Sequence, residues 1–294
     1  MPEIVPHLWF DRSARDAVTL YMSAFGNSEI VSSGSLSDTP SGTVEIVVLD
    51  LAGQRFQLLF AGPEFKFTPA VSFLASCATE QEAELLWQRL SDGGQVLMPF
   101  SAYPFSKLYG WTQDRYGLSW QIMLVTGRDI EQRITPFLMF TGGNAGRAEE
   151  AMRFYTSLFP DSGIGHIARY GADREPDKDG TVMFGSFTLA DQQFAAMDSA
   201  HPHGFGFNEA ISFMVSCEDQ AEIDGYWNGL AADPNAGQCG WLKDRYGLSW
   251  QIVPAAMREM MSRGSREQIA RVTKAFLKMK KFDLAALQRA YDGN

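Results

Sequence analysis

His7 and Gln121 are the two side chains of this sequence that best combine polar chemistry with apolar neighbours. His7 lies in the otherwise apolar run Ile4–Phe10, and a neutral imidazole with a pKa of about 6.5 can act as an acid or a base in a dry cleft. Gln121 follows Trp120, and neighbouring strand residues point to opposite faces. If Trp120 fills a core, Gln121 faces the other side, where a buried amide needs a partner such as a substrate or a fixed water. We therefore take His7 and Gln121 as candidate catalytic residues.

A twelve-residue segment occurs twice, as Trp111–Ile122 and Trp241–Ile252, with ten identical residues. Such an internal repeat indicates a duplicated domain, in which each position can be compared with its twin. The twin of His7 is Phe137, so packing at this position does not require an imidazole, which favours a functional role for His7. A packed, hydrogen-bonded histidine remains an alternative, as does a bond between neighbouring strands for Gln121 and Gln251.

The repeat can be followed along the chain and divides it into two domains. We expect a first domain at 1–126, a linker at 127–133, a second domain at 134–254 and a helical tail at 255–294. Within the first domain the pattern of apolar residues predicts a strand, a helix and three strands, and then the same order again. The expected segments are 4–10, 12–25, 28–34, 43–51 and 54–60, followed by 70–77, 79–91, 95–98, 109–113 and 118–125.

The segment Leu97–Gly110 is rich in aromatic residues and proline, and the second domain lacks ten residues here. Long loops in compact domains are often lids or binding loops, so we expect its side chains Tyr103, Phe105 and Lys107 to contact a ligand. A loop that contacts a second copy of the chain is the alternative. Trp9 and Trp111 could stack on a flat ligand, although strand aromatics are usually core residues.

The overall composition excludes several classes of partner. The net charge of −10 and the sequence pI of about 4.9 argue against nucleic acid or an anionic membrane surface. No apolar run approaches the roughly 18 residues of a membrane span, and the N-terminus does not look like a secretion signal. We therefore expect a cytoplasmic protein. The tail from residue 265 is basic, with seven Lys or Arg against three Asp or Glu, and can dock on this chain or on a partner.

These motifs together resemble the vicinal-oxygen-chelate superfamily of glyoxalases, extradiol dioxygenases and bleomycin-resistance proteins, and within it the PhnB-like branch. The resemblance rests on Leu8-Trp-Phe-Asp, Leu20-Tyr21 and Phe25-Gly26, on their twins in the second half, and on the two Asp-Arg-Tyr-Gly-Leu-Ser-Trp-Gln-Ile strings. It implies an α+β fold with two tandem domains. Each domain would hold two strand–helix–three-strand modules that form a half-open mixed sheet around a cleft, and helices would follow at the C-terminus.

The resemblance also implies positions for a metal centre. Its metal enzymes carry four inward-facing ligands, which fall here at His7, Gln57, Ser72 and Gln121, and in the second domain at Phe137, Ala195, Ser212 and Gln251. Divalent transition metals prefer imidazoles and at least one anionic oxygen. The first set offers one imidazole with neutral oxygens, and Phe and Ala cannot coordinate a metal. We therefore expect no firmly bound cofactor, with a weak divalent metal site at His7 in the first domain as the alternative.

The expected activity concerns a small molecule. We expect substrate contacts from Trp9, Gln57, Ser72, Tyr103, Phe105, Lys107, Trp111 and Gln251. An enzyme acting on an oxygenated apolar or aromatic metabolite and a metal-free binding protein of the resistance type both remain open. The branch is customarily labelled a 3-demethylubiquinone-9 3-methyltransferase. This chain lacks the glycine-rich strand-to-helix turn followed by an acidic residue that suits a nucleotide-like methyl donor, which disfavours that activity. A monomer acting as a pseudo-dimer and a homodimer are both compatible with the duplication.

Overall fold

The structure is a computed structural model that describes residues 2–235 and 237–294. The chain divides into two compact units, one made of residues 1–7 and 212–294 and the other of residues 8–211. This division differs from that of the sequence repeats, because the beginning of the first repeat groups with the last part of the second. Strand β1 (Ile4–Phe10) contains the point at which the chain passes from one unit to the other.

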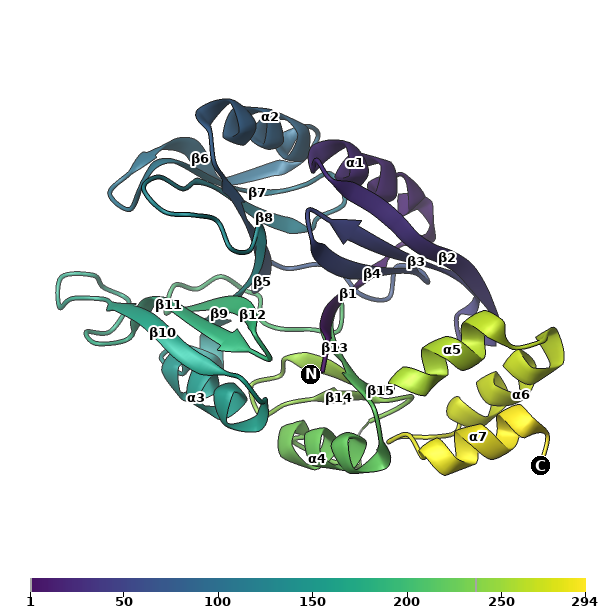
Figure 1. Cartoon of the computed structure of the whole chain (residues 1–294). Coiled ribbons are helices and arrows are strands. Elements are labelled where there is room, and N and C mark those ends of the chain that lie inside the picture. Colours follow the sequence, from purple (N-terminus) through teal and green to yellow (C-terminus); the bar gives the residue numbers. More distant parts are fainter. Residues whose placement is uncertain (1, 236) are drawn as a thin grey trace. The chain divides into compact units, whose positions relative to one another are not determined.

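The unit of residues 8–211 contains a mixed sheet of eight strands, half of them from each repeat (Figure 1). The strand order is β10-β11-β12-β9-β5-β8-β7-β6, and the central strands β9 and β5 are antiparallel. Helix α2 (Glu80–Ser91) packs on β7 and β8, and α3 (Ala148–Leu158) packs on β11. The strands are β5 (Val71–Cys77), β6 (Gln95–Tyr103), β7 (Ser106–Gln113), β8 (Ser119–Leu124), β9 (Ile134–Thr141), β10 (Gly163–Arg169), β11 (Val182–Leu189) and β12 (Gln192–Ser199).

The same unit contains the rest of the first module. Strands β2 (Ser28–Thr39), β3 (Gly42–Leu51) and β4 (Gln54–Phe60) form consecutive antiparallel pairs. Helix α1 (Ala17–Ala24) follows a short 3-10 turn at Arg12–Asp16 and contacts α2. A second 3-10 turn lies at Gly142–Asn144.

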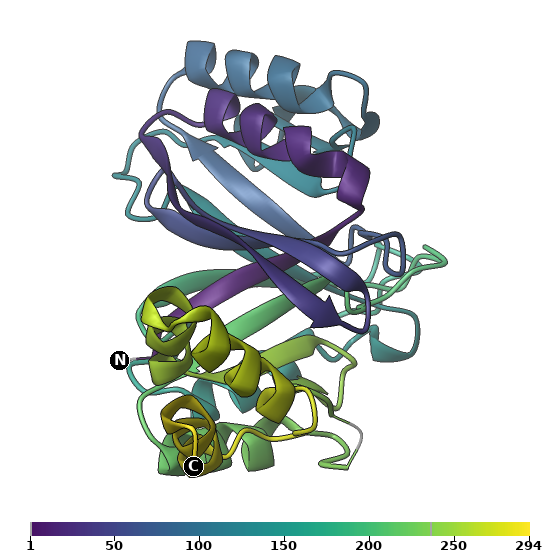
Figure 2. The same ribbon diagram turned by 90° about the vertical axis from the view of Figure 1, so that its right-hand side faces the viewer.

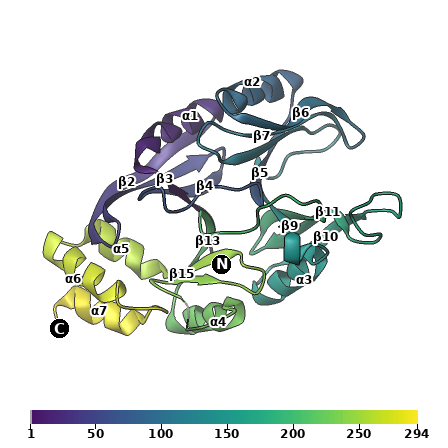
Figure 3. The same cartoon turned by 180° about the vertical axis from the view of Figure 1, so that it is seen from behind.

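The unit of residues 1–7 and 212–294 is built on strands β13 (Ile211–Cys217), β14 (Trp241–Lys243) and β15 (Ser249–Pro254). Strand β15 lies between the other two, and α4 (Gln220–Leu230) packs on β14 and β15 (Figure 3). The tail forms α5 (Ala255–Arg263), α6 (Arg266–Phe276) and α7 (Leu284–Asp292), which pack in succession (Figure 2). Asp283 caps the last helix by accepting from Ala286 N.

The twin residues Trp120 and Trp250 lie on the opposite face of their strands from Gln121 and Gln251. In the unit of residues 8–211, Trp120 is fully buried and its ring contacts those of Tyr21, Phe25 and Phe73. Its twin Trp250 is buried against Phe213. Because strand residues alternate between faces, Gln121 and Gln251 lie on the opposite side of their sheets, as predicted.

Asp114 forms a tight turn before β8. Its Oδ1 accepts from the backbone N–H groups of Tyr116 and Leu118, and Gly117 has a φ of 87°, which favours glycine. Its Oδ2 accepts from Tyr21 Oη at 2.7 Å and from Trp120 Nε1 at 3.0 Å. The buried carboxylate therefore ties the turn to helix α1 and to the core.

The segment 97–110, expected to be a loop, is instead most of a β-hairpin formed by β6 and β7. Proline usually favours a loop, but β6 is the edge strand of its sheet, where a proline such as Pro99 is tolerated. Pro99 lies where the register shifts between Met98 and Ser101. Gly110 allows close packing, because a Cβ atom there would lie 2.6 Å from the Trp87 ring.

The predicted α+β fold with repeated strand–helix–strand modules is confirmed. The strand–helix–three-strand order occurs three times, and in the fourth copy the described residues form β14 and β15 after the helix, where ten residues of the repeat are missing. Among the residues described, no helix is long and apolar enough to span a bilayer.

Candidate functional site

A chain of uncharged hydrogen bonds crosses one face of the eight-stranded sheet. Tyr109 Oη donates to Gln121 Oε1 at 2.9 Å, and Gln121 Nε2 donates to Ser72 Oγ at 2.8 Å. All three side chains are buried. Burial raises the pKa of Tyr109 well above its ordinary value, so this phenol stays protonated and acts as a donor to Gln121.

The surroundings of this chain are apolar and come from both repeats. Ser72 on β5 lies opposite Phe137 on β9, and Phe137 lies opposite Ala195 on β12. We call this surface the Gln121 face. Its residues are Ser72, Leu74, Met98, Tyr103, Tyr109, Trp111, Gln121, Met123, Phe137, Phe184, Ala195 and Met197.

The hairpin β6–β7 places further aromatic rings beside this face. Phe105 stacks on Tyr103 with ring centroids 5.6 Å apart and lies edge-on to Tyr109 at 5.0 Å. Although it is apolar, Phe105 is 63% exposed. Trp111 is half-buried and donates from Nε1 to Ser119 Oγ. Lys107 is exposed on β7.

The unit of residues 1–7 and 212–294 repeats part of this arrangement. Gln251 Nε2 donates to Ser212 Oγ at 2.9 Å, as Gln121 does to Ser72. Trp241 lies opposite Gln251, just as Trp111 lies opposite Gln121. We call this surface the His7 face, and its residues are His7, Ser212, Met214, Trp241, Gln251 and Val253.

His7 takes the place that Phe137 has on the Gln121 face. Strands β13 and β1 are joined by a backbone bond from Ser216 N to Glu3 O, and β5 and β9 by the matching bond from Ser76 N to Arg133 O. The two strand pairs therefore have the same register. Because Ser72 lies opposite Phe137, Ser212 lies opposite His7. The imidazole lies edge-on to the Trp241 ring, with centroids 5.3 Å apart. Burial lowers the pKa of His7 to about 4, so the ring is neutral at physiological pH.

The structure does not bring the two candidate catalytic residues together. His7 lies in the unit of residues 1–7 and 212–294, whereas Gln121 and Ser72 lie in the other unit and in a different sheet. Gln251 lies on the His7 face rather than on the Gln121 face. Of the predicted substrate contacts, Ser72, Tyr103, Lys107 and Trp111 lie on strands of the same sheet as Gln121, and Phe105 lies in the turn between β6 and β7.

Gln57 and Trp9 lie apart from the Gln121 face. Gln57 is half-buried on β4 opposite Val48, the same register that Ala195 has with Ser186. Gln57 and Ala195 therefore hold the same position in their modules. Trp9 Nε1 donates to Gly62 O, and its ring packs edge-on against Phe65, contacts that are sufficient for a structural role.

Neither face fits the divalent metal centre that the superfamily resemblance implies. On the Gln121 face, the amide and hydroxyl donors already bond one another, and Phe137 and Ala195 offer no ligand atom. On the His7 face, one imidazole is accompanied by neutral oxygens and by no carboxylate. A divalent transition metal held by such donors would compete poorly with water as a ligand. Within the described part of the chain, no group of three or more His, Cys, Asp or Glu is arranged to hold a metal.

Sequence analysis missed Tyr109, which begins the hydrogen-bond chain. It lies two residues before Trp111. On a strand, residues two apart point to the same face, so this spacing indicated that Tyr109 and Trp111 share a face. Tyr109 was the first residue of the expected strand 109–113, but it was also counted in the loop 97–110 and was given no role in the site.

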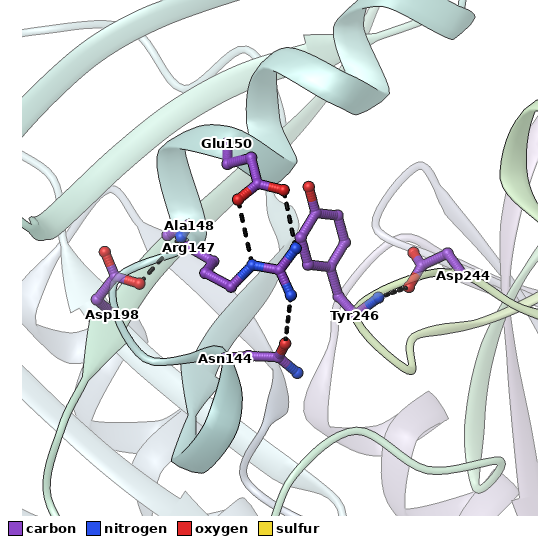
Figure 4. Close-up of polar contacts among 7 residues, drawn as sticks. All are labelled: Asn144, Arg147, Ala148, Glu150, Asp198, Asp244 and Tyr246. Atoms are coloured by element: carbon purple, nitrogen blue, oxygen red, sulfur yellow. Dashed lines mark hydrogen bonds and ion pairs between the residues drawn. The ribbon is translucent and has the colours of Figure 1, made fainter. Parts of the chain in front are cut away.

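Asp198 was also missed, and its role is structural. Its Oδ1 accepts from Ala148 N at the start of α3 (Figure 4). Oδ1 also accepts from Gly146 N, and Oδ2 accepts from Val182 N. Burial raises its pKa. The same figure shows the Asp244 turn of the other unit, in which Oδ1 accepts from Tyr246 N, as in the twin turn at Asp114.

A surface hollow of about 440 Å³ lies at the linker rather than at the Gln121 face. It is lined by Ala78 and by residues around Gly127 and Arg133. Arg133 pairs with Glu82 here, so the hollow contains the contact between the linker and α2 and carries none of the candidate groups.

Comparisons with known proteins agree with this architecture. A family model described as 3-demethylubiquinone-9 3-methyltransferase matches residues 2–123 and again 132–253. A PhnB protein structure from Bacillus cereus is 36% identical, with a TM-score of 0.38, and the alignment covers 41% of this chain and 98% of that one. Glyoxalase I from Zea mays is 12% identical, with coverage of 88% and 96% and a TM-score of 0.56, a similarity that concerns the fold alone. No curated protein matched the chain.

Each match to the family model covers one sequence repeat, and the two matches together cover most of the chain. The chain therefore belongs to the family described as 3-demethylubiquinone-9 3-methyltransferase, the PhnB-like branch of the vicinal-oxygen-chelate superfamily, and contains two copies of its domain in tandem.

Proposed function

We propose that the Gln121 face binds a small, oxygenated aromatic molecule without the help of a metal. The observation that carries this proposal is the hydrogen-bond chain Tyr109–Gln121–Ser72 set within a surface of Met, Trp, Phe and Ala side chains. Ligand sites typically combine an apolar lining with a few placed polar groups. The second N–H of Gln121 and the Ser72 hydroxyl can donate to a ligand oxygen, while the aromatic side chains contact its ring.

Binding fits this face better than acid–base catalysis does. Such catalysis favours a group whose pKa lies near the working pH. The polar residues of the face are Ser72, Gln121, Tyr103 and a Tyr109 phenol whose pKa is raised by burial, and the face has no histidine or carboxylate. The family description names a methyl transfer, but the sequence lacks the turn expected for a nucleotide-like methyl donor. The proposal is therefore confined to binding.

The test uses 2-naphthol as the probe and 2-methylnaphthalene as its counterpart without a hydroxyl group. Methionine methyl NMR signals report the site, because Met98 and Met123 lie on the Gln121 face and Met214 lies on the His7 face. We expect 2-naphthol to shift Met98 and Met123 and to bind about tenfold more tightly than 2-methylnaphthalene, which corresponds to one net hydrogen bond.

Gln121→Leu should weaken 2-naphthol binding about tenfold at Met98 and Met123, since the amide donor is lost. The matched control is Gln251→Leu, which makes the same change at the twin position and should leave both signals unaffected. Unchanged affinity in Gln121→Leu, or equal affinity for the two probes, contradicts the proposal.

A further inference from the structure

The last two helices of the tail are joined by a segment that is bonded to the turn before β14. This segment, Leu277–Leu284, runs from the end of α6 to the first residue of α7 (Figure 1), and we call it the strap. Cys239 N donates to Met279 O, and Gly240 N donates to Lys280 O, both at 2.8 Å. The strap therefore lies beside the residues that come directly before β14.

The strap lies where ten residues of the repeat are missing from the fourth module. In the second module β6 pairs with β7, whereas β14, the twin of the last part of β7, is the terminal strand of the described seven-stranded sheet. A Cβ atom on Gly110 would lie 2.9 Å from the Phe100 ring of β6. A Cβ atom on its twin Gly240 would lie 2.5 Å from the Phe282 ring. Phe282 of the strap therefore takes the place that Phe100 has in the second module.

Two glutamine side chains also hold the backbone of the strap. Gln220 of α4 donates from Nε2 to Phe282 O at 3.1 Å and accepts at Oε1 from Leu284 N at 2.9 Å. Gln238 Nε2 donates to Leu277 O at 2.6 Å. In peptide recognition, main-chain hydrogen bonds of this kind give affinity, and pockets for single side chains give specificity. The contacts of the strap thus resemble those of a bound peptide.

Within the strap, all of which the structure describes, only the Phe282 side chain is buried. Lys281 pairs with Asp224 of α4 at 2.6 Å, and partly exposed pairs of this kind contribute little to stability. Helices α6 and α7 pack on each other, so they can move together. Opening of the strap therefore breaks few buried contacts and needs less free energy than unfolding of the whole unit.

We propose that the strap is a separable peptide ligand of its own chain, and that Gln220 and the turn 238–240 form its dock. The dock fits an extended segment in which lysines precede one aromatic residue, and it binds that segment through the backbone and the aromatic ring. When the strap leaves, the edge of β14 and the Cys239 thiol become accessible to solvent. The proposal uses no residue of the Gln121 face, so it is independent of the binding proposed there.

Opening of the strap is measured by alkylation of the three cysteines of the full chain with N-ethylmaleimide, followed by mass spectrometry. Cys239 is half-buried, whereas Cys77 and Cys217 are buried and report unfolding. Phe282→Ala should raise the alkylation rate of Cys239 about tenfold, because the strap loses its buried ring, and should leave the rate of Cys217 unchanged. The control Gln288→Leu, at an exposed residue of α7, should change none of the three rates. A wild-type rate at Cys239 in Phe282→Ala, or a rate at Cys217 that rises in step with it, overturns the proposal.

A second measurement leaves the strap and its dock unchanged in the folded chain. A protease site is inserted between Gly264 and Ser265, the full chain is cut there, and a labelled peptide of residues 265–294 is added in excess. We expect the cut tail to stay bound during gel filtration and to exchange with the labelled peptide. The peptide with Phe282→Ala should bind about tenfold more weakly, and the peptide with Gln288→Leu should bind as the wild type does. A cut tail that falls away, a tail that does not exchange, or equal binding of the Phe282→Ala peptide refutes the proposal.

Discussion

The Gln121 face and the His7 face share a framework and differ in what lies opposite their serine. Both have a Gln amide bonded to a Ser hydroxyl and a Trp on the strand beside the Gln. On the Gln121 face the residue opposite the serine is Phe137, and Tyr109 extends the hydrogen bonds. On the His7 face that place holds an imidazole whose pKa is lowered by burial to about 4.

The comparison shows which parts of a duplicated domain tolerate change. The turn at Asp114 and Asp244 and the buried Trp120 and Trp250 make matching hydrogen bonds in the two units, because they position the strand that carries the Gln. The residue opposite the serine packs against one aromatic ring of its own face, Phe184 for Phe137 and Trp241 for His7, and takes no part in the Asp turn, so histidine and phenylalanine can both occupy this place. Specificity can therefore diverge while the framework stays constant.

The largest expected effect comes from removing the shared turn. Asp114→Ala should lower the free energy of unfolding by about 3–5 kcal/mol, because Tyr21, Trp120 and two backbone N–H groups lose a buried acceptor. Asp244→Ala should cost a similar amount. Urea unfolding of both variants measures this loss. A variant that is as stable as the wild type would show that its turn does not stabilise the fold.

A second difference between the faces is the pH dependence that His7 brings. Its pKa is about 4 when folded and about 6.5 when unfolded, so the unfolded chain binds the proton more tightly. The contribution to stability is complete above the unfolded value and falls as the pH decreases, by about 3 kcal/mol at pH 4. His7→Phe should lose this part of the acid sensitivity. Unfolding curves of both proteins from pH 8 to pH 4 provide the check, and parallel pH profiles would refute the assignment.

A smaller effect should distinguish the two glutamines. Gln121→Leu removes the side chain that both Tyr109 and Ser72 bond to, whereas Gln251→Leu removes the one that Ser212 bonds to. Since an unsatisfied buried group costs about 1–3 kcal/mol, Gln121→Leu should be the more destabilising by about 1 kcal/mol or more. Thermal and urea unfolding of the two variants decide this, and equal losses would mean that Tyr109 contributes nothing to the chain.

The smallest expected change in stability concerns the hairpin that only the first repeat possesses. Phe105 is 63% exposed, and Phe105→Ser should alter stability by no more than about 0.5 kcal/mol. The same variant should weaken 2-naphthol binding about threefold if the exposed ring contacts the ligand. Val96→Ser, at another exposed apolar residue of the hairpin, is the control, and its binding should not change.

Local features of both faces were predictable from the sequence. The opposite orientation of Trp120 and Gln121 follows from strand alternation, and the Asp114 turn follows from Asp and Gly at fixed spacing. Strands at 95–98 and 109–113 were predicted, but their continuation into one long hairpin was not, because Pro99 and Pro104 favour loops and the tolerance of Pro99 depends on β6 being an edge strand. Tyr109 was the first residue of the predicted strand 109–113, but only the pairing of β7 with β8 places it on the face of Gln121.

The sequence by itself determined the duplication, the order of strands and helices in each module, and the face on which each side chain lies, because these depend on residues close together in the chain. Only the tertiary structure decided that Ser72 lies opposite Phe137 and that His7 and Gln121 lie in different sheets. Strands pair through backbone N–H and C=O groups, which are the same in every residue. Which strands pair among similar modules therefore depends on how whole apolar faces pack together. Because the four modules have nearly the same pattern of residues, the sequence does not reveal which of them pair.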